Sequence, residues 1–301
     1  MVIPPYLKAG DKIGIAAPGR KISVEDFKAA ENIIASWGVE VVTARNLFSS
    51  AHGYMAGSDT ERLNDLQDFI DDPEIKAIIC ARGGYGTTRI LDDIDFSILQ
   101  QQPKWIVGFS DITAMHLRLA KLGISSIHAT MPVLFSRSDS SPSVESLWAV
   151  LRGTKPEISA LPDRMNQYGK ATGQLIGGNL SLVADAIGTL NDPDTKGKIL
   201  VLEEVDEYTY KIDRMLMHLI RSGKMDGLAG LVIGHMTDIK EPELPFGQSV
   251  KEVILEKVSR FGYPISFNFP IGHENPNLAW VHGALMTLTV TENGSQLAPA
   301  F

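Results

Sequence analysis

The sequence predicts an α/β protein with an N-terminal, mostly parallel sheet flanked by helices and a smaller mixed α/β C-terminal domain. Three observations support this prediction. Short apolar runs alternate with helical patterns through the first half of the chain, which is typical of βαβ units. The pattern weakens between residues 136 and 166, and then resumes in a less regular order. With 301 residues and 44% apolar content, the chain is long enough for two domains.

In the N-terminal half, the apolar pattern predicts strands and helices in strict alternation. The expected strands are 12–17, 39–43, 75–80, 105–108 and 125–128. The expected helices are 24–37, 60–70, 87–91 and 112–122. Because parallel strands end at the same edge of a sheet, we expect the loops 17–19 and 82–86 and the turn at Ser110 to lie together, and we expect function at that edge.

A domain junction is expected where serine, proline and aspartate punctuate the chain around a single helical stretch, 144–151. We expect an N-terminal domain at 1–140, a linker region at 141–168 and a C-terminal domain at 169–301. In the C-terminal domain, the pattern predicts strands at 171–176, 199–203, 229–233, 264–269 and 285–290. It predicts helices at 180–190, 210–222 and 249–260.

The composition excludes several classes of partner. The formal net charge is −8, and the 28 lysines and arginines form no cluster, so nucleic acid and anionic membranes are not expected to bind. A small molecule or peptide is the expected partner. No apolar run reaches the roughly 18 residues of a membrane span, and the N-terminus lacks a signal-peptide pattern, so the expected location is the cytoplasm. The single cysteine, Cys80, is expected to be a buried and inert strand residue.

The most informative motif is Gly108-Phe109-Ser110-Asp111, between an apolar run and a helical pattern. A strand that enters a helix through Gly-x-Ser presents the hydroxyl on a tight turn at a helix N-terminus, where backbone N–H groups can stabilise an oxyanion. Ser110 is therefore a candidate nucleophile. The alternative is that Ser110 only caps the helix, a common role for serine.

A nucleophilic serine needs a base and an orienting acid. His128 ends a predicted strand in the same half as Ser110, and His273 lies in a turn-rich loop after a predicted strand. Position in the sequence alone favours His273 only slightly over His128 as the base. Glu203 follows four apolar residues at a strand end, where a partly buried carboxylate needs a partner. The acidic residues that follow it are expected to form the first turn of the next helix. They are Glu204, Asp206 and Glu207.

The glycine-rich stretch Arg82-Gly83-Gly84-Tyr85-Gly86 lies between a predicted strand and a helix. Its backbone N–H groups can supply a second oxyanion donor beside the N–H of Asp111. The spacing fits neither dinucleotide-binding nor P-loop patterns. No cysteine or histidine cluster has the spacing of a zinc site, so neither a metal nor a cofactor is expected.

These segments together resemble the LD-carboxypeptidase (murein tetrapeptide carboxypeptidase) family of serine peptidases, which includes microcin-C-type self-immunity peptidases. The matching motifs follow the family's order along nearly the whole chain. They are Gly14–Gly19, Ala56–Asp59 with Arg62, Arg82–Gly86, Gly108–Thr113, Gly177–Leu180, Leu202–Arg214 and Gly272-His273.

The resemblance implies a Ser-His-Glu triad of Ser110, His273 and Glu203, and an oxyanion hole formed by the backbone N–H groups of Asp111 and Gly84. It also implies hydrolysis of the L,D-peptide bond before a C-terminal D-alanine in a muropeptide, through an acyl-enzyme, by a cytoplasmic homodimer in peptidoglycan recycling. Arg82 is a candidate for binding the substrate. The segment that begins at His128 departs from the family pattern, which leaves the role of His128 open.

Two alternative functions remain from the sequence. One is a related peptidase or amidase that cleaves a peptide–nucleotide conjugate of the microcin C type. The other is a non-catalytic protein that binds a small molecule, in which Ser110 only caps a helix.

Overall fold

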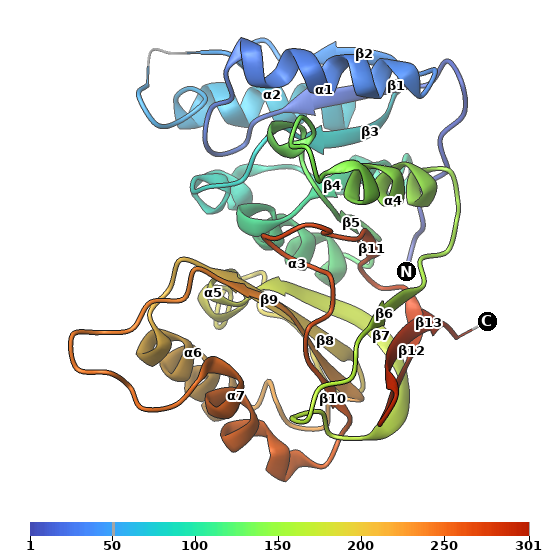
Figure 1. Cartoon of the computed structure of the whole chain (residues 1–301). Coiled ribbons are helices and arrows are strands. Elements are labelled where there is room, and N and C mark those ends of the chain that lie inside the picture. The colour runs from blue at the N-terminus through green and yellow to red at the C-terminus, as the bar shows by residue number, and fades with distance from the viewer. Residues whose placement is uncertain (50–51, 301) are drawn as a thin grey trace. The chain divides into compact units, whose positions relative to one another are not determined.

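The computed structural model describes residues 1–49 and 52–300, and these divide into two compact α/β units (Figure 1). Unit 1 comprises Met1–Thr154 and Leu278–Val281, and unit 2 comprises Lys155–Asn277 and His282–Phe301. The predicted α/β class with two sheets is confirmed. In the part of the chain that the structure describes, no helix is both long and apolar enough to cross a membrane.

Unit 1 is built on a six-stranded sheet in the order β11-β5-β4-β3-β1-β2. Its strands are β1 (Lys12–Ala16), β2 (Glu40–Thr43), β3 (Ile75–Cys80), β4 (Trp105–Gly108), β5 (Ile127–His128) and β11 (Trp280–Val281). Its α-helices are α1 (Val24–Ser36), α2 (Asp59–Asp71), α3 (Thr113–Lys121) and α4 (Ser141–Leu151). Short 3₁₀ helices occur at η1 (Thr87–Arg89), η2 (Leu91–Asp93), η3 (Ser97–Gln100), η4 (Ser110–Ile112) and η5 (Pro132–Leu134).

The first five strands run parallel, and β11 pairs antiparallel with β5. The order 2-1-3-4-5 reverses direction between β1 and β3, which is the point where open α/β sheets bind ligands, at the carboxyl ends of the strands. The loops that follow β1 and β3, together with the turn that follows β4, therefore lie at the edge of the sheet where such folds bind ligands.

Aromatic side chains attach the helices of unit 1 to the sheet and to one another. The ring of Phe69 in α2 lies against β1, where a Cβ at Gly14 would approach it to 2.7 Å. Trp37, at the end of α1, stacks on Trp148 of α4 with ring centroids 4.8 Å apart. Helix α4 thus belongs to unit 1, and the boundary between the units falls after Thr154, inside the segment 141–168 that the sequence analysis treats as a linker.

Unit 2 contains a seven-stranded mixed sheet in the order β10-β9-β8-β7-β12-β13-β6. Its strands are β6 (Ile158–Ala160), β7 (Gly169–Asn179), β8 (Ile199–Val205), β9 (Gly230–Thr237), β10 (Ile265–Ser266), β12 (Leu285–Thr291) and β13 (Gly294–Pro299). Its helices are α5 (Leu180–Asp185), α6 (Thr209–Arg221), α7 (Val250–Val258) and the 3₁₀ turn η6 (Ser259–Phe261). Helices α5, α6 and α7 lie in a row (Figure 1).

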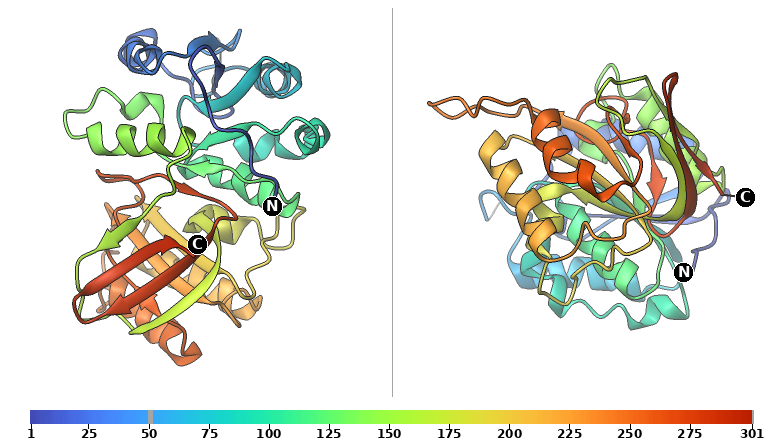
Figure 2. Two further views of the ribbon diagram at one scale, coloured as in Figure 1. Left: turned by 90° about the vertical axis from the view of Figure 1, so that its right-hand side faces the viewer. Right: turned by 90° about the horizontal axis from the view of Figure 1, so that it is seen from below.

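The sheet of unit 2 has two parts. Strands β7 to β10 are parallel, as expected for strands joined through helices. Strands β12, β13 and β6 add an antiparallel part, and β12 and β13 form the long hairpin seen in red in Figure 2. Strands β6, β11 and β13 were not predicted from the sequence, because each is short or polar and gains its strand character from pairing with a neighbour.

Candidate active site

Ser110 lies at the end of β4 in a strained turn, with φ of +61°. The other non-glycine residues with positive φ in the described chain are aspartates and an asparagine, which tolerate this conformation better than serine does. The N-cap positions of η4 and α3 are Phe109 and Ile112, and neither makes a side-chain cap hydrogen bond. The conformation matches the strained strand-to-helix turn that exposes a nucleophilic serine.

The glycine-rich loop after β3 approaches this turn at Gly83. A Cβ on Gly83 would lie 3.2 Å from Ser110 Oγ and 3.0 Å from Ser110 Cβ, so only glycine fits against the hydroxyl without displacing it. A Cβ on Gly84, which has φ of +113°, would instead meet the hydroxyl of Tyr54 at 2.7 Å and the Cβ of Arg20 at 2.9 Å. The Gly83–Gly84 peptide thus lies between Ser110 and a second group of side chains.

Asp111 connects the Ser110 turn to the glycine-rich loop. It is 1% exposed, and its Oδ2 accepts a hydrogen bond of 2.9 Å from the backbone N–H of Thr87. Burial raises the pKa of this carboxyl, and the hydrogen bonds from Thr87 and Gly86 oppose that rise. The side chain of Asp111 therefore holds the two loops in register, and its backbone N–H remains the predicted oxyanion donor.

A buried arginine holds the loops after β1 and β3 together. The Arg62 guanidinium is 1% exposed and donates to the carbonyl oxygens of Pro18 and Gly86, the latter at 2.9 Å. It also pairs with Asp59, which in turn binds Arg89. The sequence signal for this network was the motif Ala56–Asp59 with Arg62, whose role as a clamp between loops only the contacts reveal.

In unit 2, Glu203 and His273 form a hydrogen-bonded pair. Glu203 Oε2 lies 2.7 Å from His273 Nδ1, the carboxylate is fully buried, and the imidazole is 18% exposed. Glu203 belongs to β8, and His273 lies in the loop after β10. Because a carboxylate accepts hydrogen bonds, Nδ1 carries a proton, and Nε2 is the proton-accepting nitrogen of the neutral ring.

The surroundings of this pair favour the imidazolium. Burial lowers the pKa of His273, but the charge of Glu203 and its hydrogen bond outweigh burial, so the pKa lies above the ordinary value. Two glycines leave room for the carboxylate. A Cβ on Gly272, which has φ of +123°, would lie 3.0 Å from Glu203 Oε2, and a Cβ on Gly234 would lie 3.3 Å from Glu203 Cβ.

The expectation that Glu204, Asp206 and Glu207 form the first turn of the next helix is wrong, because all three precede the helix that begins at Thr209. Glu204 lies within β8, is 2% exposed, and accepts hydrogen bonds from Asn179 Nδ2 and from both the N–H and hydroxyl of Ser181. A register shift between Leu202 and Glu204 in the pairing of β8 with β9 accompanies the two successive buried carboxylates. Helix α6 begins later, at Thr209.

The other histidines occupy different surroundings. His116 in α3 has Nδ1 2.8 Å from Ser126 Oγ and donates Nε2–H to the carbonyl of Gly108 at 2.9 Å, and burial lowers its pKa to about 4. His128 is buried in β5, where it stacks on Trp280 at 5.1 Å and packs against Phe109 at 5.7 Å.

His235 lies close to the Glu203–His273 pair and was missed by the sequence analysis. Its Nδ1 accepts the backbone N–H of Glu274 at 3.2 Å, and its Cβ lies against Gly272. Burial lowers the pKa of His235, which the charges of Glu274 and Glu203 oppose. Its position near the carboxyl end of β9 was its only sequence signal, since polar residues at the carboxyl end of a parallel strand are functional candidates.

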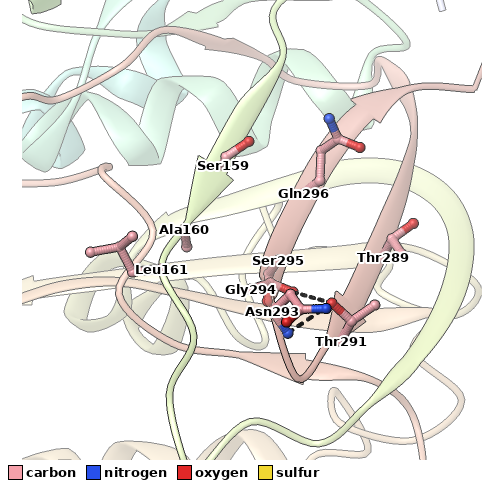
Figure 3. A pocket seen from close by; sticks show the side chains of 9 residues that line it. All are labelled: Ser159, Ala160, Leu161, Thr289, Thr291, Asn293, Gly294, Ser295 and Gln296. Atoms are coloured by element: carbon pink, nitrogen blue, oxygen red, sulfur yellow. Dashed lines mark hydrogen bonds between the residues drawn. The ribbon is translucent and has the colours of Figure 1, made fainter.

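Surface hollows in unit 2 differ in their chemistry. A hollow of about 340 Å³ adjoins the Glu203–His273 pair and includes His235, Lys251, Asn268 and Glu274 in its wall. A larger hollow of about 460 Å³ lies over β6, β12 and β13 (Figure 3), and its lining residues include no acid, base or nucleophilic thiol. Only the first is suited to a substrate side chain beside the catalytic candidates.

The remaining candidates have these positions. Arg82 is half-buried on the loop after β3, next to Gly83. Cys80 is fully buried at the end of β3, and burial raises the pKa of its thiol, as expected for an inert cysteine. Among residues 1–49 and 52–300, no group of three or more histidine, cysteine, aspartate or glutamate side chains is arranged to hold a metal ion.

Known proteins similar to this chain share both units. The model of the LD-carboxypeptidase N-terminal domain matches residues 13–129, and that of the LD-carboxypeptidase C-terminal domain matches residues 172–288. A probable murein peptide carboxypeptidase of Bacillus subtilis is 34% identical over 96% of this chain and 92% of its own length.

Two crystal structures illustrate the likeness in fold. The muramoyltetrapeptide carboxypeptidase of Oxalobacter formigenes has a TM-score of 0.87 and 31% identity, covering 96% of this chain and 99% of that one. An MccF-like protein of Bacillus anthracis has a TM-score of 0.87 and 24% identity over the full length of both chains. The second likeness is one of fold alone.

Proposed function

Because the chain belongs to the LD-carboxypeptidase family of serine peptidases, and so is a hydrolase, we propose that it hydrolyses the L,D-peptide bond before a C-terminal D-alanine in muropeptide tetrapeptides, as part of peptidoglycan recycling. The observation that carries the proposal is the pairing of Glu203 with His273 at 2.7 Å in one unit, together with the strained turn that presents Ser110 in the other. The names of the similar carboxypeptidases support the substrate class.

We propose that Ser110, His273 and Glu203 act as a triad. His273 Nε2 takes the proton of Ser110, and Ser110 Oγ attacks the carbonyl carbon that precedes the terminal D-residue. The negative charge that develops on the carbonyl oxygen is stabilised by the backbone N–H groups of Asp111 and Gly84. His273 then donates its proton to the departing amine of D-alanine. In the second half of the reaction, His273 takes a proton from water, the water oxygen attacks the acyl carbon, and His273 returns the proton to Ser110 Oγ as the ester bond breaks.

The assignment of His273 as base is supported by the partners of the histidines. Glu203 can stabilise an imidazolium at His273, which is what a general base becomes after accepting a proton. His116 is poorly suited, because burial lowers its pKa to about 4 and Gly108 and Ser126 bond its two nitrogens. His128 has the rings of Trp280 and Phe109 packed against it.

The test is to incubate the purified protein with a muropeptide tetrapeptide and measure released D-alanine by mass spectrometry. Ser110→Ala is expected to release none, and a fluorophosphonate is expected to label Ser110 of the native protein. His273→Asn and the matched variant His128→Asn identify the base, because only the former is expected to be inactive. An inactive His128→Asn beside an active His273→Asn would place the base in unit 1.

The same assay separates the proposal from its alternatives. A peptide–nucleotide conjugate offered in place of the tetrapeptide tests the microcin-type peptidase, and cleavage of that conjugate alone would assign the protein to that function. A protein that is neither labelled by fluorophosphonate nor active on either substrate would be a non-catalytic binder.

We extend the proposal to a cytoplasmic homodimer that needs no cofactor, which the family resemblance supports. Light scattering after gel filtration is expected to give twice the mass of the chain, and the mass of one chain would contradict the dimer. Fractionation of the native cells, with detection by antibody, is expected to recover the protein with the cytoplasmic contents.

A further inference from the structure

Four arginine side chains lie around the loops after β1 and β3, and they divide into two kinds. Arg62 and Arg89 both pair with the carboxylate of Asp59. Arg20 and Arg82 form no ion pair in the part of the chain that the structure describes. Neither guanidinium is therefore paired directly with a carboxylate of the described residues, although the charge of Asp26 also acts on Arg82.

Both arginines adjoin the glycines of the loop that touches the candidate nucleophile. Gly83 lies against Ser110 Oγ, as the 3.2 Å approach of a Cβ at that position shows. Arg82 directly precedes Gly83, so the Cα atoms of the two residues are about 3.8 Å apart. Gly84 directly follows, and a Cβ there would lie 2.9 Å from the Cβ of Arg20. A three-residue stretch thus joins both arginines to Ser110.

The arrangement around Arg20 is held by backbone pairing and by an aromatic ring. The Arg20 guanidinium lies 5.1 Å from the centre of the Tyr54 ring, and the backbone N–H of Lys21 donates to the carbonyl of Tyr54 at 3.2 Å. The Tyr54 hydroxyl points to Gly84, where a Cβ would approach it to 2.7 Å. The Arg20 side chain and the Tyr54 hydroxyl therefore both lie beside Gly84.

The charges of the two arginines repel each other. Burial lowers the pKa of Arg82, and the nearby charge of Arg20 lowers it further. Like charges held together without a counter-ion destabilise the protein unless an anion binds between them. A carboxylate is suited to this position, because its two oxygens match the paired N–H groups of a guanidinium.

We propose that Arg20 and Arg82, with the hydroxyl of Tyr54, bind the α-carboxylate of the C-terminal residue that the enzyme releases. This inference rests on the proposed function and adds the residues that determine its specificity for a chain end. In a C-terminal residue, three bonds separate the carboxylate carbon from the attacked carbonyl carbon, a span of about 4 Å. A subsite beside Gly83, which touches Ser110, is at a suitable distance for the carboxylate of the terminal residue.

The subsite explains how one site restricts cleavage to the last residue of a peptide. A longer peptide has an uncharged amide in place of the terminal carboxylate, and this amide leaves both guanidinium groups without an anion. A site built to bind a charged group discriminates strongly against an analogue that lacks it. Specificity for the chain end thus comes from unit 1, on the loops that also flank the nucleophile.

The experiment compares two substrates that differ only at this group, a muropeptide tetrapeptide and the same peptide with its C-terminal carboxylate converted to an amide. The native enzyme is expected to prefer the acid by about 10²-fold in kcat/KM. Arg82→Gln and Arg20→Gln are each expected to lower kcat/KM for the acid by about 10- to 100-fold, mainly through KM, and to leave the amide unchanged. Arg82→Lys is expected to give a kcat/KM for the acid between those of the native enzyme and Arg82→Gln.

A matched control is Arg152→Gln in unit 1, an exposed arginine that also lies over an aromatic ring, that of Trp148 at 5.7 Å. This substitution is expected to leave kcat/KM unchanged for both substrates. The rate at which a fluorophosphonate labels Ser110 is expected to be the same in all variants, because the subsite acts on the leaving residue and not on the nucleophile. Circular dichroism checks the fold of each.

The outcomes separate this inference from the function on which it rests. If native enzyme cleaves the acid but the arginine variants keep the native ratio of acid to amide, the subsite is overturned and the function stands. Equal losses on both substrates also overturn the subsite, because they indicate damage to the triad or the loops. If native enzyme releases no D-alanine from the acid, the proposed function is refuted, and the inference falls with it.

Discussion

Replacing Glu203 by glutamine removes the negative charge beside His273 while keeping the size of the side chain. The carboxylate is fully buried, so solvent screens it little. Two unit charges about 4 Å apart attract each other by about 4 kcal/mol at an effective dielectric constant of 20. If Glu203 stabilises the imidazolium formed in the transition state, losing that attraction lowers turnover by about 10³-fold, and we expect a loss of 10² to 10⁴.

The same substitution changes the dependence of activity on pH. In the native protein, burial lowers the pKa of His273 and Glu203 raises it by more, so activity is expected to rise with pH through an inflection above the ordinary histidine value of about 6.5. In Glu203→Gln the lowering by burial remains and the main opposing charge is gone. The inflection is therefore expected to move to lower pH even though turnover falls.

The assay is the steady-state rate of D-alanine release between pH 5 and 9, for native protein and for Glu203→Gln. The control is Glu204→Gln, which alters a neighbouring buried carboxylate bonded to Asn179 and Ser181. It is expected to lower the melting temperature but to retain turnover within about tenfold. If Glu203→Gln keeps a native fold, near-native turnover and an unmoved inflection, Glu203 does not act on the base.

Three further predictions concern Ser110, the adjoining glycine Gly83, and the need for a metal ion. Ser110→Ala and Ser110→Gly are both expected to abolish D-alanine release, and Ser110→Gly is expected to be about 0.5–1 kcal/mol more stable to unfolding than Ser110→Ala, because glycine adopts φ of +61° without the strain that alanine incurs. Equal stability in chemical denaturation would mean that this turn is not strained. Gly83→Ala is expected to lower kcat at least tenfold, because its Cβ would stand 3.2 Å from Ser110 Oγ. A native kcat in this variant would show that the loop can shift without displacing the Ser110 hydroxyl. Incubation with a chelator is expected to leave activity unchanged, because the described residues form no cluster of metal ligands; activity lost to chelator and restored by a divalent ion would contradict a metal-free mechanism.

Most of the order of strands and helices could be predicted from the sequence because it depends on local patterns, but the helix expected at 87–91 is instead a pair of short 3₁₀ turns. The run from Trp105 to Gly108 is apolar throughout, and the residues from Thr113 to Lys121 repeat with helical period, so β4, α3 and the turn between them follow from short stretches of chain. Parallel strands then bring their loops to one edge. Ser110 could be identified in this way, whereas Glu203 and His273 were assigned from the family resemblance.

Contacts between distant residues could not be predicted in this way. Glu203 and His273 are 70 residues apart, and their hydrogen bond exists because the loop after β10 returns to the end of β8. Glu204 was expected in a helix, since acidic residues are common in a first turn, but the pairing of β8 with β9 keeps it in the strand. Strand pairing overrides a local preference because it satisfies buried backbone groups.

By itself, the sequence determined the two-part α/β architecture, the glycine-rich loop and the position of the candidate nucleophile, since periodicity and turn residues act over a few neighbours. Only the tertiary structure decided that Ser110 takes a left-handed conformation, that Gly83 lies against its hydroxyl, and that Arg20 and Arg82 form no ion pair within residues 1–49 and 52–300. These properties depend on the separation and burial of groups far apart in the chain, which set steric contact and charge interactions and which no local pattern encodes.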